Sequence, residues 1–339
     1  MIIDLRSDTV TKPTPGMIDA MTKASVGDDV FREDPTVNFL ENKMASLFGM
    51  ESALYCSSGT MSNQIAIACH TRKGDEVICE QEAHVYIYEG GGIAYNAGCQ
   101  VRPLKGDRGR INAAQVQEVI NPSEVYKART SLVCLENTSN RGGGSCYDLN
   151  EIVKIHSVCS AHGLSLHLDG ARLFNALVAK NESPLDYGKL FHSISVCFNK
   201  GLGCPVGSIL LGTEKFIHQA RRIRKVFGGG MRQSGFLAAT AVYALEHHID
   251  RLSTDHLHAN KIAAGLQNHP LVKAVMPVET NLVIFELHEG IDHAGFISKF
   301  REKDILFFSI SEKKLRIITH MDISEEMVDI FLKVLSRIR

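Results

Sequence analysis

A lysine and an aspartate stand at the ends of two apolar stretches of the chain. Lys200 follows the run 193–199, and Asp169 follows the run 164–168. An amine held partly out of water at the end of a strand is a good nucleophile for a carbonyl group. A carboxylate in such a place can keep a pyridine nitrogen protonated, so that the ring withdraws electrons. The structural alternatives are a lysine that reaches solvent and an aspartate paired with Arg172.

A short polar segment, Ser58-Gly59-Thr60, separates an apolar run from the helix-like sequence 61–68. A junction between a strand and a helix offers free backbone N–H groups and hydroxyls that can hold a phosphate dianion. Capping of the helix by Ser58 or Thr60 is the structural alternative. The segment lacks the lysine that ends the glycine loop of a nucleotide P-loop.

The elements that would position these residues alternate between apolar runs and helix-like segments from about residue 50 to 215. This alternation predicts an α/β fold with a mainly parallel sheet, in which ligands bind beyond the carboxyl ends of the strands. The sequence from about 213 to 252 is predicted to be helical, and 255–339 is predicted to form a smaller α+β domain. The predicted strands are Ser52–Cys56, Glu76–Cys79, Thr130–Leu135, Leu164–Leu168, Ser193–Phe198 and Gly207–Leu211.

Composition excludes several classes of partner. The chain has 339 residues, 44% hydrophobic and 22% charged, which is typical of a soluble globular protein with one large or two moderate domains. The net charge of −1 gives no overall field that would attract nucleic acid or an anionic membrane. A small neutral or zwitterionic partner is favoured.

The cysteines and the N-terminus indicate a cytoplasmic protein. The nine cysteines are an odd number, show no Cys-x-x-Cys spacing and lie mostly in apolar runs, so we expect reduced, packed thiols. The first residues lack the basic start and apolar stretch of a signal peptide, and no run of about 18 apolar residues occurs.

Two groups of basic residues are interpreted as surface features. The run Arg221–Lys225 is typical of the exposed face of a helix. The histidines of the sequence 247–258 have no convincing set of metal-binding partners, so we expect them on the surface and predict no metal site; they are His247, His248, His256 and His258.

Eight segments in order resemble the low-specificity L-threonine aldolases, a family of the fold type I pyridoxal-phosphate (PLP) enzymes in the group that contains the β-eliminating lyases. The resemblance covers essentially the whole chain. It implies a seven-stranded, mainly parallel sheet in a large domain at 16–252, a small domain at 253–339 and an N-terminal segment at 1–15 that contributes to the site. The segments are 5–11, 27–30, 33–38, 58–60, 135–138, 167–172, 200–203 and 228–233.

The resemblance also implies a role for each candidate residue. Lys200 would form the Schiff base with the cofactor, Asp169 would contact its pyridine nitrogen, and His84 would stack on its ring. The phosphate would be held by Ser58, Gly59 and Thr60, and the substrate carboxylate by Ser7, Arg172 and Arg316, with Arg172 also close to the cofactor. Lys225 and Arg232 would reach the phosphate of a neighbouring subunit, so the resemblance implies a homodimer or a homotetramer built as a dimer of dimers.

The implied reaction is the retro-aldol cleavage of L-threonine and L-allo-threonine to glycine and acetaldehyde. His84, or a water that it orients, is the candidate base for the β-hydroxyl proton. One alternative is β-elimination from a cysteine- or tyrosine-like amino acid on the same cofactor. Another is a nucleotide-dependent oxidoreductase that uses the glycines at 90–92 or 142–144, but neither cluster fits Gly-x-Gly-x-x-Gly between a strand and a helix.

Two positions depart from the family. Tyr126 stands where relatives often carry a histidine that touches the substrate β-hydroxyl, and Phe31-Arg32 replaces a usual Tyr-Gly. A phenol donates a hydrogen bond at neutral pH and is a poor base, so Tyr126 is expected to orient the β-hydroxyl and influence which β-epimer is preferred. The alternative is a loop residue that points at solvent.

Overall fold

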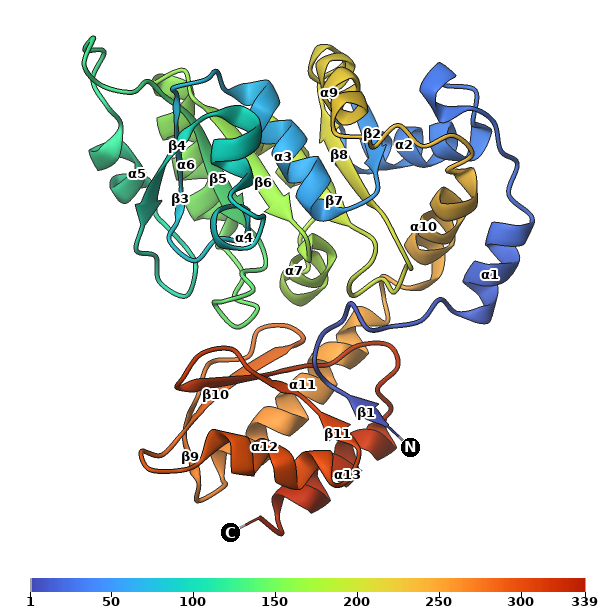
Figure 1. Cartoon of the computed structure of the whole chain (residues 1–339), viewed down its shortest axis with the longest axis vertical. Helices are drawn as coiled ribbons and strands as arrows, with labels where there is room; N and C mark the ends of the chain where they lie inside the picture. Colours follow the sequence, from blue (N-terminus) through green and yellow to red (C-terminus); the bar gives the residue numbers. More distant parts are fainter. Residues whose placement is uncertain (1, 339) are drawn as a thin grey trace.

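Seven strands form the large sheet in the computed structural model of the chain, which describes residues 2–338 (Figure 1). The strand order is β2-β8-β7-β6-β5-β3-β4, and all neighbouring strands are parallel except at β8, which is antiparallel to both of its neighbours. The predicted mainly parallel, seven-stranded sheet is therefore confirmed. The strands are β2 (Ser52–Cys56), β3 (Glu76–Glu80), β4 (Gln100–Leu104), β5 (Thr130–Glu136), β6 (Ser165–Gly170), β7 (Ser193–Cys197) and β8 (Ser208–Gly212).

The edge strand β4 is absent from the six strands that the apolar runs predict. It pairs only with β3, and Arg102 and Pro103 on it are exposed. An edge strand tolerates proline and needs no continuous apolar run. The apolar signal that identifies the inner strands is therefore missing here.

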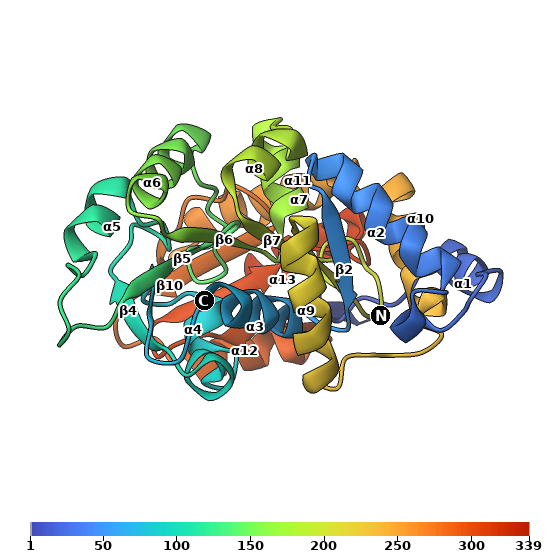
Figure 2. The ribbon, with the colours of Figure 1, turned by 90° about the horizontal axis from the view of Figure 1, so that it is seen from above.

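Helices cover both faces of this sheet (Figure 2), which explains why every residue of the inner strands β3, β5 and β7 is buried. None of the helices within residues 2–338 is long and apolar enough to cross a membrane. One face carries α3 (Gly59–His70), α4 (His84–Ile87) and α9 (Glu214–Val226), and the other carries α2 (Pro35–Phe48), α5 (Ala113–Val119), α6 (Leu149–Ala161), α7 (Leu173–Lys180) and α8 (Pro184–Leu190). The remaining helices of this part are α1 (Pro15–Thr22), which packs on α10 (Gly235–His247), the 3₁₀ helix η1 (Asp29–Phe31) and the π-helix η2 (Ile93–Ala97).

The predicted helical run 213–252 is broken between α9 and α10. Gly228 has a φ of 77°, a left-handed conformation that ends the helix in a glycine-rich turn. The basic run on α9 is only partly exposed, in contrast to the prediction. Arg224 is buried and donates hydrogen bonds of 2.7 Å to Asp29 and 2.6 Å to the carbonyl of Tyr55.

The C-terminal part has its own sheet and core, as the predicted smaller α+β unit requires. An antiparallel sheet of order β12-β13-β10-β9 packs against helices around a second hydrophobic core. Leu252 at the start of α11 packs in the large core, whereas Ala259 packs in the second, so the proposed boundary at 252 falls on a helix that joins both. The elements are α11 (Leu252–Gln267), β9 (Val272–Val275), β10 (Leu282–Leu287), α12 (His293–Arg301), β11 (Ile305–Leu306), β12 (Phe308–Ser309), β13 (Lys314–Ile318) and α13 (Glu325–Leu335).

The N-terminal strand β1 (Ile3–Asp4) belongs to this C-terminal part. It lies beside β11 (Figure 1) and pairs with it in parallel, and Ile3 and Leu5 are buried in the second core. The residues that follow, including Asp8, are thereby carried to the carboxyl edge of the large sheet.

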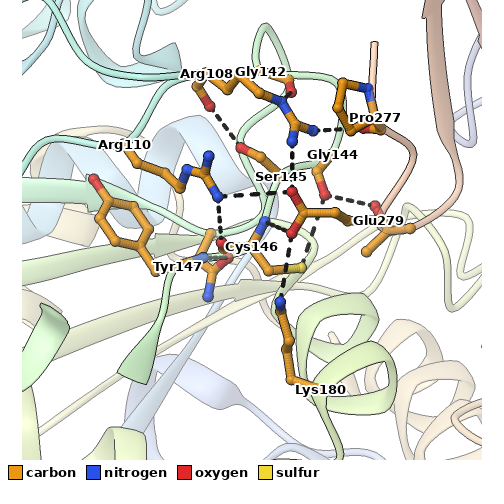
Figure 3. Close-up of polar contacts among 12 residues, drawn as sticks. Arg108, Arg110, Gly142, Gly144, Ser145, Cys146, Tyr147, Lys180, Pro277 and Glu279 are labelled. Atoms are coloured by element: carbon orange, nitrogen blue, oxygen red, sulfur yellow. Dashed lines mark hydrogen bonds and ion pairs between the residues drawn. The ribbon is translucent and has the colours of Figure 1, made fainter. Parts of the chain in front are cut away.

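One carboxylate ties the two parts together on the side of the loop that follows β5 (Figure 3). Glu279 accepts hydrogen bonds of 2.7 Å from Arg108 and 3.1 Å from the backbone N–H of Cys146, and it lies 3.6 Å from the amine of Lys180. The same loop carries Asn140, which holds Arg316 in the site. The cluster therefore fixes the C-terminal part at the place where it contributes a guanidinium.

The prediction that the histidines of 247–258 lie on the surface is wrong for three of the four. His248, His256 and His258 are buried, because α10 and α11 pack against the rest of the chain. His248 contacts the carbonyl of Leu202 at 2.8 Å, and His256 contacts the side chain of Asn175 at 2.9 Å. His248 and His256 are therefore packing residues with hydrogen-bond partners, whereas Nδ1 of His258 is buried without a partner within residues 2–338.

The cysteines agree with the prediction of packed thiols. All nine are free, and eight of them are buried.

Candidate functional site

The polar segments that follow the strands meet at one edge of the large sheet, as their positions predict. Glu136 at the end of β5 is the register partner of Asp169 on β6, and Asp169 is the partner of Ser195 on β7, which leads to Lys200. This edge faces the C-terminal part (Figure 1). Residues from several separate segments of the sequence are therefore available for one site.

Asp169 is a buried carboxylate held by neutral donors. Its two oxygens accept hydrogen bonds of 3.0 Å from the side-chain amide of Asn63 and 3.1 Å from the backbone N–H of Ala171. Within residues 2–338, no arginine or lysine forms an ion pair with it. The alternative that Asp169 pairs with Arg172 is therefore wrong, and its charge remains available for a cationic ring nitrogen.

His84 is fixed by a second buried carboxylate, Glu89. Nδ1 of His84 lies 2.9 Å from Glu89, which also accepts hydrogen bonds from Asn63 and Gln64. Burial lowers the pKa of His84, but the hydrogen bond to Glu89 and the charge of Asp169 outweigh it, so that the pKa is raised. The ring is thereby held with Nδ1 toward Glu89 and Nε2 away from it.

Glu136 is a third carboxylate at this edge. It accepts hydrogen bonds of 2.9 Å from the backbone N–H groups of His84 and Asn140. Burial, followed by the negative charge of Asp169, raises the pKa of Glu136 to about 7. Glu136 can therefore gain or lose a proton near neutral pH, and it ties the His84 segment to the loop after β5.

Lys200 has an amine without a partner in the described chain. The residue is half-buried, and no hydrogen bond or ion pair joins its Nζ to any of residues 2–338. Its positive charge lowers the pKa of Asp8 and opposes protonation of His84, which places it near both groups. An amine in this position can react with a carbonyl group.

The start of α3 lies close to the strand that leads to Lys200. A Cβ atom on Gly59 would come within 2.5 Å of Sγ of Cys197, so only glycine permits this approach. The hydroxyl of Ser58 caps the helix by accepting a 3.2 Å hydrogen bond from the N–H of Met61, as the structural alternative expected. The first backbone N–H groups of the helix and the exposed Thr60 remain available to a phosphate.

Arg172 forms a buried ion pair with Asp8. Its Nε and one terminal nitrogen each donate a 2.7 Å hydrogen bond to the two oxygens of Asp8, and Asn281 contacts the same carboxylate at 3.3 Å. Burial acts to raise the pKa of Asp8, but Arg172 outweighs it and the pKa falls to about 2. Asp8 therefore neutralises Arg172 in the folded chain.

Arg316, like Lys200, is a cation of the site without a carboxylate partner within residues 2–338. Its terminal nitrogens donate hydrogen bonds of 2.9 Å to Asn140 and 3.3 Å to the carbonyl of Arg6, and its Nε is buried without a partner within residues 2–338. Burial, and then the charge of Arg172, lower its pKa to about 10. A guanidinium in this condition is suited to binding a small carboxylate, and Ser7 lies next to Arg6 in the same segment.

The residues predicted to act across a subunit boundary lie away from this site. Arg232 is about half exposed, pairs with Asp28 at 2.7 Å and lies 5.9 Å from the ring of Phe31. Lys225 is exposed and lines an open pocket of about 690 Å³ on the outer side of α9. Neither forms a hydrogen bond or ion pair with Lys200 within residues 2–338, and their contact with the phosphate of a neighbouring subunit stays a prediction.

The substrate-binding role predicted for Tyr126 is wrong within one chain. Tyr126 lies in the loop before β5, at the amino edge of the sheet and therefore opposite the site, with 78% of its surface exposed. The alternative of a loop residue that points at solvent is the one observed. The other departure, Phe31-Arg32, also lies at the surface, because Phe31 is 68% exposed.

Sequence reasoning did not assign several residues that shape the site, including Glu136. Asp8 and His167 stand inside segments that carry the family resemblance, so their position offered a signal. Asn63 and Glu89 lie on helical or irregular segments with no local pattern. Only the packing of α3 against β6 and the loop after α4 brings them to Asp169 and His84.

Comparison with known proteins identifies the family. The beta-eliminating lyase family matches the chain over residues 4–290. The chain belongs to the beta-eliminating lyase family. It is 38% identical to the low-specificity L-threonine aldolase 1 of Arabidopsis thaliana, over 95% of this chain and 92% of that protein. It is also 38% identical to the low specificity L-threonine aldolase of Escherichia coli strain K12, over 96% of both chains.

Solved structures confirm the fold of this beta-eliminating lyase family member. A threonine aldolase from Leishmania major superposes with a TM-score of 0.87 at 22% identity and covers 99% of both chains. A serine palmitoyltransferase from Sphingomonas wittichii superposes with a TM-score of 0.76 at 16% identity, over 98% of this chain and 86% of that one. The expected fold type I architecture is therefore shown.

The family implies PLP, and the described residues fit it. The cofactor offers an aldehyde, a pyridine nitrogen and a phosphate, for which the site has an unpartnered amine, a cation-free carboxylate and a helix N-terminus. Two buried oxygens after β5 and β7 also lack partners within residues 2–338, namely Oγ1 of Thr138 and Oδ1 of Asn199. Polar atoms left unsatisfied at such places are consistent with a polar ligand.

The Asp8–Arg172 pair predicts how stability changes in acid. The pKa of Asp8 is about 2 in the folded chain, against an ordinary value of 3.8. A carboxyl whose pKa is lowered by folding stabilises the folded state above its unfolded pKa, and this contribution is lost as the pH falls from about 4 to about 2. We expect Asp8 to account for a loss of about 2 kcal/mol over this window. Urea unfolding of wild type and Asp8→Asn at a series of pH values measures the difference.

The free energy of unfolding of Asp8→Asn should also be lower than that of wild type at pH 7, by about 3–5 kcal/mol, because the substitution leaves the guanidinium of Arg172 buried without a counter-charge. Asp186→Asn is the control, since Asp186 pairs with an exposed lysine. Equal acid dependence of wild type and Asp8→Asn would contradict the prediction.

Proposed function

We propose that this chain is a PLP-dependent aldolase that cleaves L-threonine and L-allo-threonine to glycine and acetaldehyde, with other β-hydroxy-α-amino acids as further substrates. The single observation that carries the proposal is the guanidinium of Arg316, which has no carboxylate partner within residues 2–338 and lies near Asp8, whose other neighbours are Arg172 and the amine of Lys200. An amino acid needs an anchor for its carboxylate and a cofactor for its amine, and this edge offers groups for both. The names of the relatives in Arabidopsis thaliana and Escherichia coli support the choice of threonine.

The cofactor would be held by residues from four strand ends, those of β2, β3, β6 and β7. In this proposal Lys200 links to its aldehyde carbon, Asp169 contacts the ring nitrogen, and His84 lies against the ring. The phosphate is held at the start of α3 by Ser58, Gly59 and Thr60. When bound, the cofactor supplies an electron-withdrawing ring that takes up the electron pair left on Cα when the Cα–Cβ bond breaks.

The substrate carboxylate would be fixed chiefly by Arg316. Arg172 is already neutralised by Asp8, so it can contribute a hydrogen bond but little net charge. Ser7 adds a hydroxyl from the same N-terminal segment. Fixing the carboxylate would orient the substrate and so select which bond at Cα breaks, and the proposal requires this to be the Cα–Cβ bond.

His84 would receive the proton of the β-hydroxyl at Nε2. Because Nδ1 donates to Glu89, neutral His84 carries its free lone pair on Nε2. Glu89 then stabilises the imidazolium that forms as the aldehyde leaves, in the way that a carboxylate supports a catalytic histidine elsewhere. The raised pKa of His84 agrees with this role, since it strengthens the base.

The second candidate is β-elimination from a cysteine- or tyrosine-like amino acid, which the family name itself favours. It would use the same amine, carboxylate and arginine but would break the Cα–H bond. The two reactions differ in their products, because elimination from cysteine yields pyruvate and aldol cleavage of threonine yields acetaldehyde.

We further propose that the active enzyme is a homodimer, or a homotetramer built from two such dimers, in which Lys225 and Arg232 reach the phosphate site of the neighbouring subunit. Their exposure supports this, because within one chain they lie away from Lys200.

Product analysis tests the proposed reaction. Purified protein loaded with PLP is incubated in parallel with L-threonine, L-allo-threonine, phenylserine and cysteine, and glycine, aldehydes and pyruvate are measured. We expect glycine with acetaldehyde from both threonine epimers, and loss of turnover in Lys200→Ala with an unchanged circular dichroism spectrum. Pyruvate from cysteine without acetaldehyde from threonine would favour elimination, and wild-type activity in Lys200→Ala would contradict the assignment of the lysine.

Replacement of Arg316 tests the carboxylate anchor. Arg316→Ala removes a charged contact to the substrate, so KM for L-threonine should rise strongly. The fall in kcat/KM should correspond to a loss of about 2–4 kcal/mol of transition-state stabilisation. Arg301→Ala, at an exposed position on α12, is the matched control and should behave as wild type. If KM is unchanged in Arg316→Ala, another group binds the carboxylate.

Mixing two inactive variants tests the shared site. Lys200→Ala damages the site of its own subunit. If Arg232 works across the interface, Arg232→Ala damages the site of the neighbouring subunit. One site of each mixed dimer would then hold both lesions and the other neither, so activity should partly recover. No recovery, with subunit exchange confirmed by mass spectrometry of labelled chains, would show that each chain has a self-contained site.

A further inference from the structure

A continuous line of hydrogen bonds leads from Asp169 through the sheet to its opposite edge. Asn63 contacts Asp169 at 3.0 Å and Nε2 of His167 at 3.1 Å. Oγ of Ser193 lies 2.8 Å from Nδ1 of His167 and 2.8 Å from Nε2 of His70. Asp169, Asn63, His167 and Ser193 are each at most 2% exposed, so water does not replace these contacts.

The charge of Asp169 fixes the direction of every proton along this line. Carboxylates only accept hydrogen bonds, so the NH₂ group of Asn63 faces Asp169 and Glu89, and its oxygen faces His167. His167 must therefore donate from Nε2, which leaves Nδ1 as an acceptor for the hydroxyl of Ser193. The oxygen of Ser193 then accepts from Nε2–H of His70, and every donor points toward Asp169.

Both histidines of the line are neutral at physiological pH. Burial, which outweighs the charge of Asp169, lowers the pKa of His167 to about 4. Burial also lowers the pKa of His70 to about 3, with the neighbouring His167 and His192 acting in the same direction. The line therefore supplies polarised donors without supplying a cation that would neutralise Asp169.

The far end of the line lies at a second cavity. His70 is the last residue of α3, stacks on Phe216 with ring centroids 4.6 Å apart, and lines a pocket of about 460 Å³ together with His156 and His192. This pocket is at the amino edge of the sheet, where β7 begins, and is therefore separated from the site by the depth of the sheet.

We propose that His167, Ser193 and His70 are positioning residues that act through Asn63 to orient and polarise Asp169, and so set how strongly the ring nitrogen of the cofactor is held in its protonated form. This rests on the proposed PLP-dependent function. Hydrogen bonds in a row strengthen one another, so a hydroxyl on β7 influences a carboxylate on β6 that it does not touch. An arginine in place of Asn63 would orient Asp169 equally well but would cancel the charge that the ring nitrogen requires.

Ser193→Ala breaks this line between the two histidines and removes only one oxygen atom. Ser208→Ala is the matched control, because Ser208 is equally buried on the neighbouring β8 and bonds to Ser62 outside the line. Both variants are freed of cofactor and titrated with PLP. We expect the dissociation constant to rise about threefold to tenfold in Ser193→Ala, as the weakening of one buried hydrogen bond implies, and to stay within about twofold of wild type in Ser208→Ala.

The second readout is the ¹⁵N chemical shift of PLP labelled at its ring nitrogen. In Ser193→Ala it should move from the protonated toward the unprotonated value, and His167→Leu, which breaks two contacts, should move it further. A purely structural role for Ser193 would lower the melting temperature without moving this signal.

The outcomes separate the two proposals. If the unsubstituted protein takes up no PLP, the proposed function is wrong and this inference falls with it. If it binds PLP and turns over threonine, but Ser193→Ala matches Ser208→Ala in both affinity and ¹⁵N shift, only the positioning role is overturned.

Discussion

The buried ion pair between Asp8 and Arg172 is the contact on which the rest of the site depends. It joins the N-terminal segment, which is anchored in the C-terminal core by Ile3 and Leu5, to the end of β6 in the large sheet. Without it, two guanidinium groups would lie near each other with no counter-charge, since Arg172 already acts to lower the pKa of Arg316. Such uncompensated buried charge is strongly unfavourable. The pair therefore permits Arg316 to remain unpaired and available to a substrate.

The carboxylates of the site differ in function because their partners differ in charge. Asp8 is matched with an arginine, so its negative charge is used inside the protein. Within residues 2–338 the carboxylate of Asp169 accepts hydrogen bonds only from a side-chain amide and a backbone N–H, so its charge is left for a ligand. Glu89 directs the ring of His84, and Glu136 has a pKa raised to about 7 by burial and by Asp169. Four acidic groups thus lie near one edge of the sheet, and where the repulsion between two of them is not offset, as between Asp169 and Glu136, it raises the pKa of Glu136.

The site also combines residues from two parts of the chain, each of which has its own hydrophobic core. The large core positions β5, β6 and β7, whereas the second core positions β13 and the N-terminal strand. The contacts of Glu279 with the loop after β5 hold these two parts against each other, and Asn140 on that loop contacts Arg316 directly. The geometry at Arg316 is therefore sensitive to how the two parts pack, even though Arg316 lies on a regular strand.

Local sequence determined the elements and the chemistry at their ends. Apolar runs identified six strands of the large sheet, and the residues directly after them included Lys200 and Asp169, because burial on both faces leaves a continuous apolar signature. Only the tertiary structure decided the remaining features. These are the edge strand β4, the burial of His248, His256 and His258, the exposure of Tyr126, and the partners of Asp8, His84 and Asp169. These features depend on which distant segment packs against a residue. A periodic pattern reports the environment of a side chain within its own element, but a hydrogen bond between α3 and β6, or between residue 8 and residue 172, is set by the packing of whole elements.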